Sequence, residues 1–261
     1  MCPPTKANPE TGVQTDEKKQ HFDDIYVCDT PVPYKTRIMD KLEYISDDFN
    51  RAMFETHISP VFAGTTGGPI KYVDLCSCFG NTTMATLHGM SYKDICANWS
   101  TEDRCAKIEK PRRSLSEKRE TTVTAMDISS QALSYGKSVG LYDETVRCDL
   151  NDRSSPEFAA CKKAIAEADV VICTASLVYL ELDTIRELVD SFSSSPGMML
   201  VNFLNPFALE KADETKRILL EKLGFVASRA TRHRKLSQLE RDNYPEFGEW
   251  ALLELWVLEK K

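Results

Sequence analysis

The chain has 261 residues, a formal net charge of −7 and a pI near 5.3. This length fits one α/β domain with additions, and the acidic balance argues against a general nucleic-acid binder. Its nine cysteines form no Cys-x-x-Cys pair, which favours a reducing compartment and argues against a zinc site. The apolar runs are too short to cross a membrane and no signal pattern opens the chain, so we expect a cytoplasmic protein.

The N-terminal part divides into a tail and a helical block. Residues 1–20 are polar and proline-bearing without apolar periodicity, so we expect a disordered tail. In the block of residues 21–69, Pro31 and Pro33 exclude a helix across their turn, and helices are expected over 34–45 and 47–62. The block either packs over the strand ends as a lid or covers a face of the sheet.

The stretch that follows has the pattern of a ligand-binding turn. Residues 70–75 are a short apolar run with the character of a buried strand, and it closes on the carboxylate of Asp74. The small residues 76–78 form a turn, and Gly80 opens a helix that begins at Asn81. A strand, a tight turn and a helix N-terminus in this order let backbone N–H groups approach a ligand closely.

Residues 91–120 read as an insertion before the next strand. Residues 92–108 are expected to be helical, and a charged loop follows with five basic residues within 110–119. The basic run predicts either an anion or RNA patch or a solvated loop. We favour the loop, because glutamates interrupt the run and no aromatic residues lie among the basic ones.

Strands and helices alternate through the rest of the chain. Two expected strands end on Asp127 and Asp149, which would place both carboxylates at the carboxyl edge of a parallel sheet, where ligands bind. The alternation predicts a mostly parallel, doubly wound, Rossmann-like α/β sheet. The polar residues 231–248 are expected to be an irregular excursion. The expected strands are 70–75, 121–126, 144–148, 169–173, 198–204, 225–230 and 250–258.

The turn also carries a resemblance to a known family. Asp74-x-Cys76-x-Cys78-x-Gly80 resembles the first signature of class I S-adenosylmethionine (SAM)-dependent methyltransferases, an acidic residue followed by three alternating glycines. Residues 76–80 and the later His88-Gly89-Met90 are similar to a bacterial subgroup that reads Asp-x-Gly-Cys-Ser-Tyr-Gly. Cysteine replaces two glycines here, and cysteine adopts positive φ less cheaply.

The resemblance spans about residues 70–205 and implies a fold. It implies a seven-stranded sheet in the order three, two, one, four, five, followed by a terminal hairpin. It also implies a SAM-binding domain over residues 70–261, with residues 21–69 as its helical lid.

The resemblance further implies the cofactor contacts. Asp127 would accept hydrogen bonds from the ribose hydroxyls, its alternative being a cap for the helix after Ser129. Asp149 would bind the adenine amino group or serve as a turn residue, and Asp74 would face the methionine part or only close its strand. The expected SAM-binding residues are Asp74, Cys76, Ser77, Cys78, Gly80, Asn81, Thr82, Asp127, Ile128, Asp149, Leu150 and Thr174.

Four residues are candidates for the reacting side of the site. Tyr179 and Asn205 follow the fourth and fifth strands, where the family places substrate-facing residues, although Tyr179 could equally belong to the core. Tyr26 and Tyr34 would press their rings on the sulfonium as cation–π partners, with surface anchoring as the alternative. No metal motif, catalytic triad or carboxylate pair is apparent, so we expect no metal.

We expect a SAM-dependent enzyme that transfers a methyl group to a small molecule. The alternative is intramolecular cyclisation of SAM to azetidine-2-carboxylate with release of methylthioadenosine. A non-catalytic SAM-binding subunit stays open, whereas an NAD-dependent oxidoreductase is disfavoured because Gly-x-Gly-x-x-Gly is absent. A small-molecule partner, no nucleic acid and no membrane are expected. A homodimer is one alternative for the oligomeric state.

Overall fold

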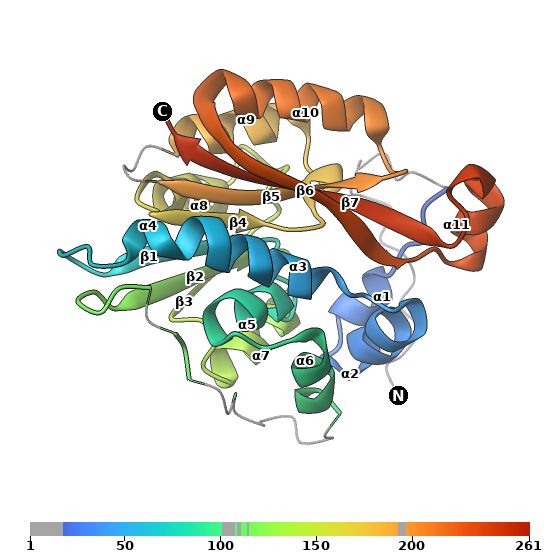
Figure 1. The fold of residues 1–261 in the computed structure, drawn as a ribbon. Helices are drawn as coiled ribbons and strands as arrows, with labels where there is room; N and C mark the ends of the chain where they lie inside the picture. Colours follow the sequence, from blue (N-terminus) through green and yellow to red (C-terminus); the bar gives the residue numbers. More distant parts are fainter. Residues whose placement is uncertain (1–17, 101–107, 109–110, 114, 193–196) are drawn as a thin grey trace.

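The computed structural model describes residues 18–100, 108, 111–113, 115–192 and 197–261. Within them, seven strands form one sheet in the order β3-β2-β1-β4-β5-β7-β6 (Figure 1). This order confirms the doubly wound arrangement that the alternation predicted and the strand order that the resemblance implied. The strands are β1 Ile70–Leu75, β2 Thr121–Asp127, β3 Glu144–Arg147, β4 Val170–Cys173, β5 Met198–Asn205, β6 Leu223–Lys235 and β7 Trp250–Lys260.

The first five strands are parallel, and their carboxyl ends meet at one edge. β1 lies between β2 and β4, with Leu75 paired to Met126 on one side and to Cys173 on the other. β7 runs antiparallel to both β5 and β6. The turn after β1 therefore lies beside Asp127 of β2 and beside the residues that leave β4.

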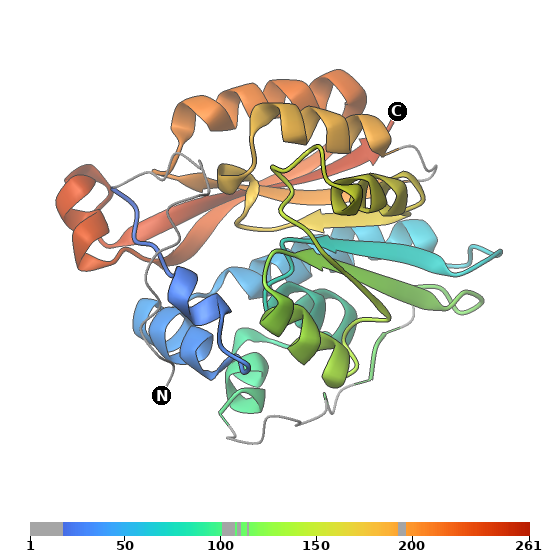
Figure 2. The ribbon, with the colours of Figure 1, turned by 180° about the vertical axis from the view of Figure 1, so that it is seen from behind.

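Helices cover both faces of the sheet. Figures 1 and 2 show α8, α9 and α10 on one side, and α3, α4, α5 and α7 on the other. The described helices are α1 Asp23–Tyr26, α2 Val32–Tyr34, η1 Lys35–Asp40, α3 Ser46–Met53, η2 Phe54–Ile58, α4 Ser59–Phe62, α5 Asn81–His88, α6 Tyr92–Asn98, α7 Ser130–Ser138, α8 Pro156–Ala166, η3 Leu177–Tyr179, α9 Leu182–Ser191, α10 Leu209–Lys222, α11 Gln238–Asn243 and η4 Pro245–Phe247.

Successive side chains of a strand point to opposite faces of the sheet, and this divides the core into two layers. Tyr72 of β1 belongs to the apolar cluster beneath α3, α5 and α7, while its neighbour Val73 belongs to the cluster beneath α8, α9 and α10. Both side chains are buried, as expected for a parallel strand covered on both faces. Serine side chains cap several helices, and Ser91 with Asp94 forms a capping box at α6.

The N-terminal block differs from the expectation in three places. The helix starts at Val32 and includes Pro33, because the fixed φ of proline suits a first helical turn. It continues as the π-helix η1, and Glu43 at φ 49° follows it. Lys19, assigned to the tail, is packed and only 5% exposed, so the predicted tail extends too far. Residues 1–17 lie outside the described residues.

Two later elements also differ. β6 extends to Lys235 because it pairs with β7 along its length, across two irregularities in register. The predicted excursion is consequently shorter, and it contains α11 and η4. The helix expected over residues 92–108 ends at Asn98. Residues 101–107 lie outside the described part of the chain.

Candidate active site

The turn after β1 has left-handed backbone at both cysteines. Cys76 and Cys78 have φ of 53° and 52°, at the positions where the resembling signature carries glycine. Gly80, at φ 87°, begins α5, and a Cβ there would lie 2.6 Å from Leu141 Cδ1. The Ser77 N–H donates to the carbonyl of Met126 at 3.0 Å, which fixes the turn against β2.

The carboxylate of Asp127 holds this turn. Its Oδ2 accepts the N–H of Cys78 at 2.8 Å, and its Oδ1 accepts the N–H of Ser129 at 2.8 Å. The side chain of Ser129 itself caps α7 by accepting the N–H of Ala132, so Asp127 is not the cap of that helix. Each carboxylate oxygen keeps a second lone pair for another donor. Burial raises the pKa of Asp127.

Two further carboxyls lie near the same turn. Asp74 is 1% exposed and accepts the hydroxyl of Thr83 at 2.6 Å. Asp47, from α3, is fully buried and accepts Asn81 Nδ2 at 3.1 and 3.0 Å. Mainly through burial, the pKa of each is raised to about 7, and the charges of Asp127 and Asp47 contribute to the rise for Asp74.

Asp47, Asp74 and Asp127 form what we call the three-carboxyl cluster. Among the described residues, no lysine, arginine or histidine makes an ion pair with any of them. The charges of Asp127 and Asp47 raise the pKa of Asp74, and a positive charge nearby would favour its ionised form. A positively charged ligand beside this cluster would therefore stabilise the ionised carboxyls.

A buried amide pair ties the N-terminal block to the sheet. Asn202 of β5 donates through Nδ2 to Asn50 Oδ1 of α3 at 3.0 Å, and its Oδ1 accepts the N–H of Ala175. The hydroxyls of Thr82 and Thr174 lie 2.7 Å apart and join α5 to the exit of β4. Sequence reasoning missed Asn50 and Asn202. The sequence signal that could have identified Asn202 is its amide side chain inside the apolar run of β5.

The two predicted aromatic residues have different environments. Tyr34 is buried and packs on Tyr26, Phe79 and Trp99 with ring centroids 6.1, 6.2 and 5.9 Å away, so it is a core residue and not a surface anchor. Tyr26 is half-buried. Burial and the charges of Cys78, Tyr179 and Asp127 raise its pKa, which places its hydroxyl within the electrostatic reach of the turn.

Tyr179 follows β4 and Asn205 is the last residue of β5, and both side chains end in polar groups. Tyr179 is 43% exposed, so the core alternative for it is wrong. It accepts a hydrogen bond from the buried Lys19 at its hydroxyl. Asn205, which precedes a cis peptide bond to Pro206, has a buried Oδ1 without a hydrogen-bond partner among the described residues.

The remaining residues predicted to contact SAM are either exposed or already engaged in contacts within the protein. Ile128 is 56% exposed beside Asp127, so its side chain is free to meet a ligand. Asp149 is half-buried and its Oδ1 accepts the N–H of Asn151 at 3.0 Å, which is the turn role. Leu150 is buried in the cluster beneath α8 and α9, where its side chain serves packing.

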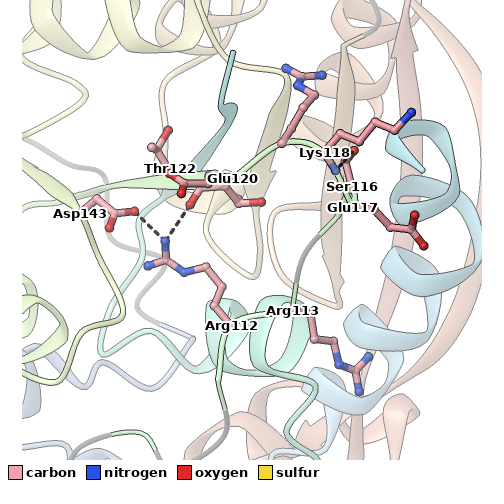
Figure 3. A pocket seen from close by; sticks show the side chains of 10 residues that line it. Arg112, Arg113, Ser116, Glu117, Lys118, Glu120, Thr122 and Asp143 are labelled. Carbon is pink, nitrogen blue, oxygen red and sulfur yellow. Dashed lines mark hydrogen bonds and ion pairs between the residues drawn. The ribbon is translucent and has the colours of Figure 1, made fainter. Parts of the chain in front are cut away.

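A hollow lies at the opposite edge of the sheet, where β2 begins (Figure 3). Arg112 lines it and donates to the carbonyl of Thr121 at 2.8 Å and to Asp143 Oδ2 at 2.7 Å. Arg119 donates to the carbonyl of Gly68 at 2.6 Å. These arginines brace the insertion against the sheet, and the hollow is remote from the turn after β1.

The described part of the chain contains neither a metal-binding cluster nor a membrane-spanning helix. No group of three His, Cys, Asp or Glu side chains there is placed to hold a metal ion. None of the described helices combines the length and apolarity needed to cross a bilayer.

Comparisons with known proteins give structural likenesses only. No family model matches the sequence, and a search of curated proteins gives no match. Magnesium protoporphyrin IX methyltransferase from Synechocystis PCC 6803, solved with bound SAM, is 13% identical, with 72% of this chain and 70% of that one covered at a TM-score of 0.40.

Two other solved structures have comparable scores. The PH0226 protein from Pyrococcus horikoshii OT3 is 12% identical, with 93% of this chain and 100% of that one covered at a TM-score of 0.45. A TehB-like SAM-dependent methyltransferase from Corynebacterium glutamicum ATCC 13032 is 11% identical, with coverages of 75% and 83% at 0.40. The fold class rests on the strand order of the sheet itself.

Proposed function

We propose that this protein is a SAM-dependent enzyme that binds SAM at the carboxyl edge of the sheet and transfers its methyl group to a small molecule. The observation that carries the proposal is the three-carboxyl cluster at a left-handed turn between strand and helix. SAM carries a sulfonium and an ammonium, and the cluster supplies negative charge without a basic partner among the described residues. The three carboxyl groups therefore fit the positively charged ligand.

Each residue of this edge would contact a different part of SAM. Asp127, held by two backbone N–H groups, presents its remaining lone pairs to the ribose hydroxyls. Asp74 and Asp47 face the positive end of the methionine part, while the turn at Cys76–Gly80 allows the close approach. Ile128 offers an exposed apolar side chain to the adenine.

The chemistry needs little beyond positioning. Bound SAM supplies an electrophilic methyl group, and in-line attack by an acceptor requires orientation and exclusion of water. Tyr26, Tyr179 and Asn205 would face the acceptor. Tyr179 follows β4, Asn205 is the last residue of β5, and Tyr26 is within electrostatic reach of Cys78. The half-buried Tyr26 shields this side, and its raised pKa keeps its hydroxyl neutral and able to donate a hydrogen bond.

Cyclisation of SAM to azetidine-2-carboxylate is the second candidate. The observation in its favour is the carboxyl of Asp47, whose pKa of about 7 suits a group that takes a proton from the α-ammonium near neutral pH. This reaction needs no acceptor. The bond that breaks is the one between sulfur and the γ-carbon, so the leaving product is methylthioadenosine.

The test is incubation of the purified protein with SAM alone and with a panel of small acceptors, followed by mass identification of the adenosyl product. Methyl transfer predicts S-adenosylhomocysteine that appears only with an acceptor. Sustained methylthioadenosine from SAM alone, above the spontaneous rate, would replace methyl transfer by cyclisation. Failure to bind SAM at all would overturn both.

A further inference from the structure

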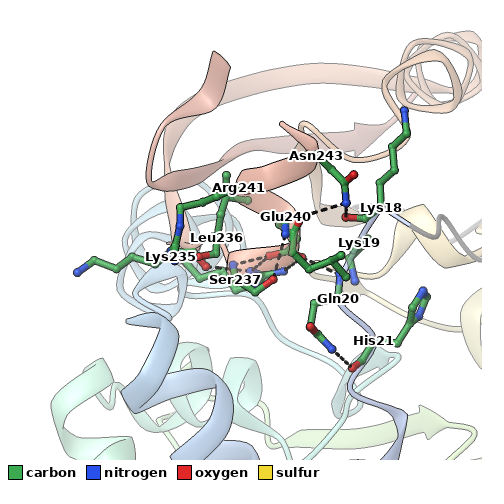
Figure 4. Close-up of polar contacts among 12 residues, drawn as sticks. Lys18, Lys19, Gln20, His21, Lys235, Leu236, Ser237, Glu240, Arg241 and Asn243 are labelled. Carbon is green, nitrogen blue, oxygen red and sulfur yellow. Dashed lines mark hydrogen bonds and ion pairs between the residues drawn. The ribbon is translucent and has the colours of Figure 1, made fainter. Parts of the chain in front are cut away.

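Residues 18–21, which we call the N-terminal strap, run across the connection between β6 and β7 (Figure 4). The N–H of Gln20 donates to Glu240 Oε1 at 3.1 Å, and Asn243 Nδ2 donates to the carbonyl of Lys18 at 3.4 Å. Glu240 is locked in turn by a buried bidentate pair with Arg234, at 2.7 Å for both bonds. The backbone of the strap is therefore held by a rigid acceptor.

This anchoring places the side chain of Lys19 inside the protein. Lys19 is only 5% exposed, and its ammonium lies 4.6 Å from the centre of the Tyr179 ring and 5.6 Å from that of Phe207. It donates one hydrogen bond, to the hydroxyl of Tyr179. Tyr179 and Phe207 follow β4 and β5, so the ammonium lies at the carboxyl edge of the sheet.

Among the residues that the structure describes, Lys19 has no carboxylate partner of the kind that a buried cation normally has. An ammonium has three donors, and burial of a charge is costly unless it is paired and hydrogen-bonded. Within the described residues no carboxylate lies within ion-pair distance of Lys19. Glu240, the acidic side chain next to the strap, is already paired with Arg234. Two donors of Lys19 thus have no acceptor in this part of the chain.

We infer that Lys19 is the carboxylate-binding residue of this site. The aromatic rings of Tyr179 and Phe207 hold the ammonium, and its two remaining N–H groups would donate to the carboxylate of a ligand. The buried Oδ1 of Asn205, also without a partner among the described residues, marks the same edge as a place for a polar ligand. The inference rests on the proposed function for its ligand, because the carboxylate belongs either to the methionine part of SAM or to a second substrate.

The first arm of the experiment compares SAM with decarboxylated SAM by calorimetry. The variants are Lys19→Met, Lys19→Arg and the matched control Lys18→Met, which replaces the exposed neighbour. If the methionine carboxylate is the ligand, Lys19→Met weakens SAM at least tenfold and leaves decarboxylated SAM unchanged. Lys19→Arg keeps part of the preference, and Lys18→Met keeps all of it. Because both ligands are measured on the same variant, partial unfolding cannot mimic the result.

The second arm addresses a carboxylate from another substrate. Benzoate and its neutral isostere benzamide are titrated into the wild type and Lys19→Met, with and without SAM. Benzoate binding that Lys19→Met weakens at least tenfold, with benzamide unaffected, assigns the carboxylate to a second substrate. Lys19→Met with unchanged affinity in both arms overturns the inference. If the wild type binds benzoate through Lys19 but not SAM, the proposed function fails while the inference holds.

Discussion

The carboxylate of Asp127 accepts the backbone N–H of Cys78 at 2.8 Å, across 49 positions of sequence. This bond joins the end of β2 to the left-handed turn after β1, so one side chain both shapes the turn and faces the proposed ligand. A carboxylate between two backbone donors cannot rotate away, which fixes the direction of its remaining lone pairs. Turn geometry and ligand recognition are therefore coupled at this residue.

Replacing Asp127 should reduce ligand affinity strongly. We expect Asp127→Ala to weaken SAM binding by about 1.5–3 kcal/mol, the usual range for hydrogen bonds to a charged group. Asp127→Asn should keep much of the turn, because an amide oxygen still accepts one N–H, and it should lose less stability than Asp127→Ala. Calorimetry and urea unfolding measure the two effects.

The control for this pair is Asp213→Ala, an exposed carboxylate on α10. It should change neither affinity nor stability. Asp127→Ala that folds and binds SAM as tightly as the wild type would remove Asp127 from the site.

The buried carboxyls should make stability depend on pH. Asp47 and Asp74 have pKa values of about 7 in the folded protein against 3.8 for the free side chain. Between about pH 4 and 7 the folded state binds more protons, so the free energy of unfolding should fall as pH rises through this window. Asp47→Asn should flatten that dependence.

Urea unfolding at pH 5, 6.5 and 8 measures this slope, with Asp213→Asn as the exposed control. SAM affinity should change in the opposite direction and rise with pH, by up to about tenfold per pH unit for each carboxyl that must ionise. Parallel stability curves for the wild type and Asp47→Asn would show that Asp47 titrates normally.

The left-handed turn should tolerate glycine and resist β-branched residues. Cys78→Gly removes the steric cost of φ 52° and should stay within about 1 kcal/mol of the wild type. Cys78→Val should be at least about 1–2 kcal/mol less stable than Cys78→Gly, because a β-branched residue is an outlier at positive φ. The matched control is Cys161→Gly in the middle of α8, where glycine should be destabilising. Equal losses of stability in Cys78→Gly and Cys161→Gly would contradict this explanation of the turn.

Ligand binding should protect the strap and α1–α2 more than α3. The segment before α3 contacts the turn through the ring of Tyr34, which packs on Phe79, whereas α3 is already fixed by the buried pair of Asn50 and Asn202. Hydrogen exchange with and without SAM should therefore slow around residues 18–34 and stay unchanged in α3. Uniform protection of both segments would indicate that the whole block closes as a lid, and no change in either would favour a static cover.

The local elements of the fold were predictable from the sequence. The strand Ile70–Leu75 was predicted to the residue, because an apolar β-branched run between a Gly-Pro break and a small-residue turn has few alternatives. The contacts that complete the site were not. Asn81 meets Asp47 across 34 positions, Asn202 meets Asn50 across 152, and Lys19 meets Tyr179 across 160. Such pairings depend on how the N-terminal part of the chain docks on the sheet, and no local sequence pattern predicts that docking.

The length of β6 shows the same limit. Its polar residues between Thr231 and Lys235 gave no strand signal, yet they pair with β7 because the partner strand dictates the register. The start of the helix at Val32 was missed for a different reason. Two prolines close together predict a break in a helix, whereas proline is compatible with a first helical turn.

The most direct test of the central claim is a calorimetric titration of the purified full chain with SAM, repeated for Asp127→Ala. We predict saturable one-to-one binding that is displaced by S-adenosylhomocysteine and weakened at least tenfold by Asp127→Ala, whereas Asp213→Ala should bind SAM as the wild type does. A folded wild-type protein that shows no saturable heat with millimolar SAM would contradict the assignment of the carboxyl edge as a SAM site.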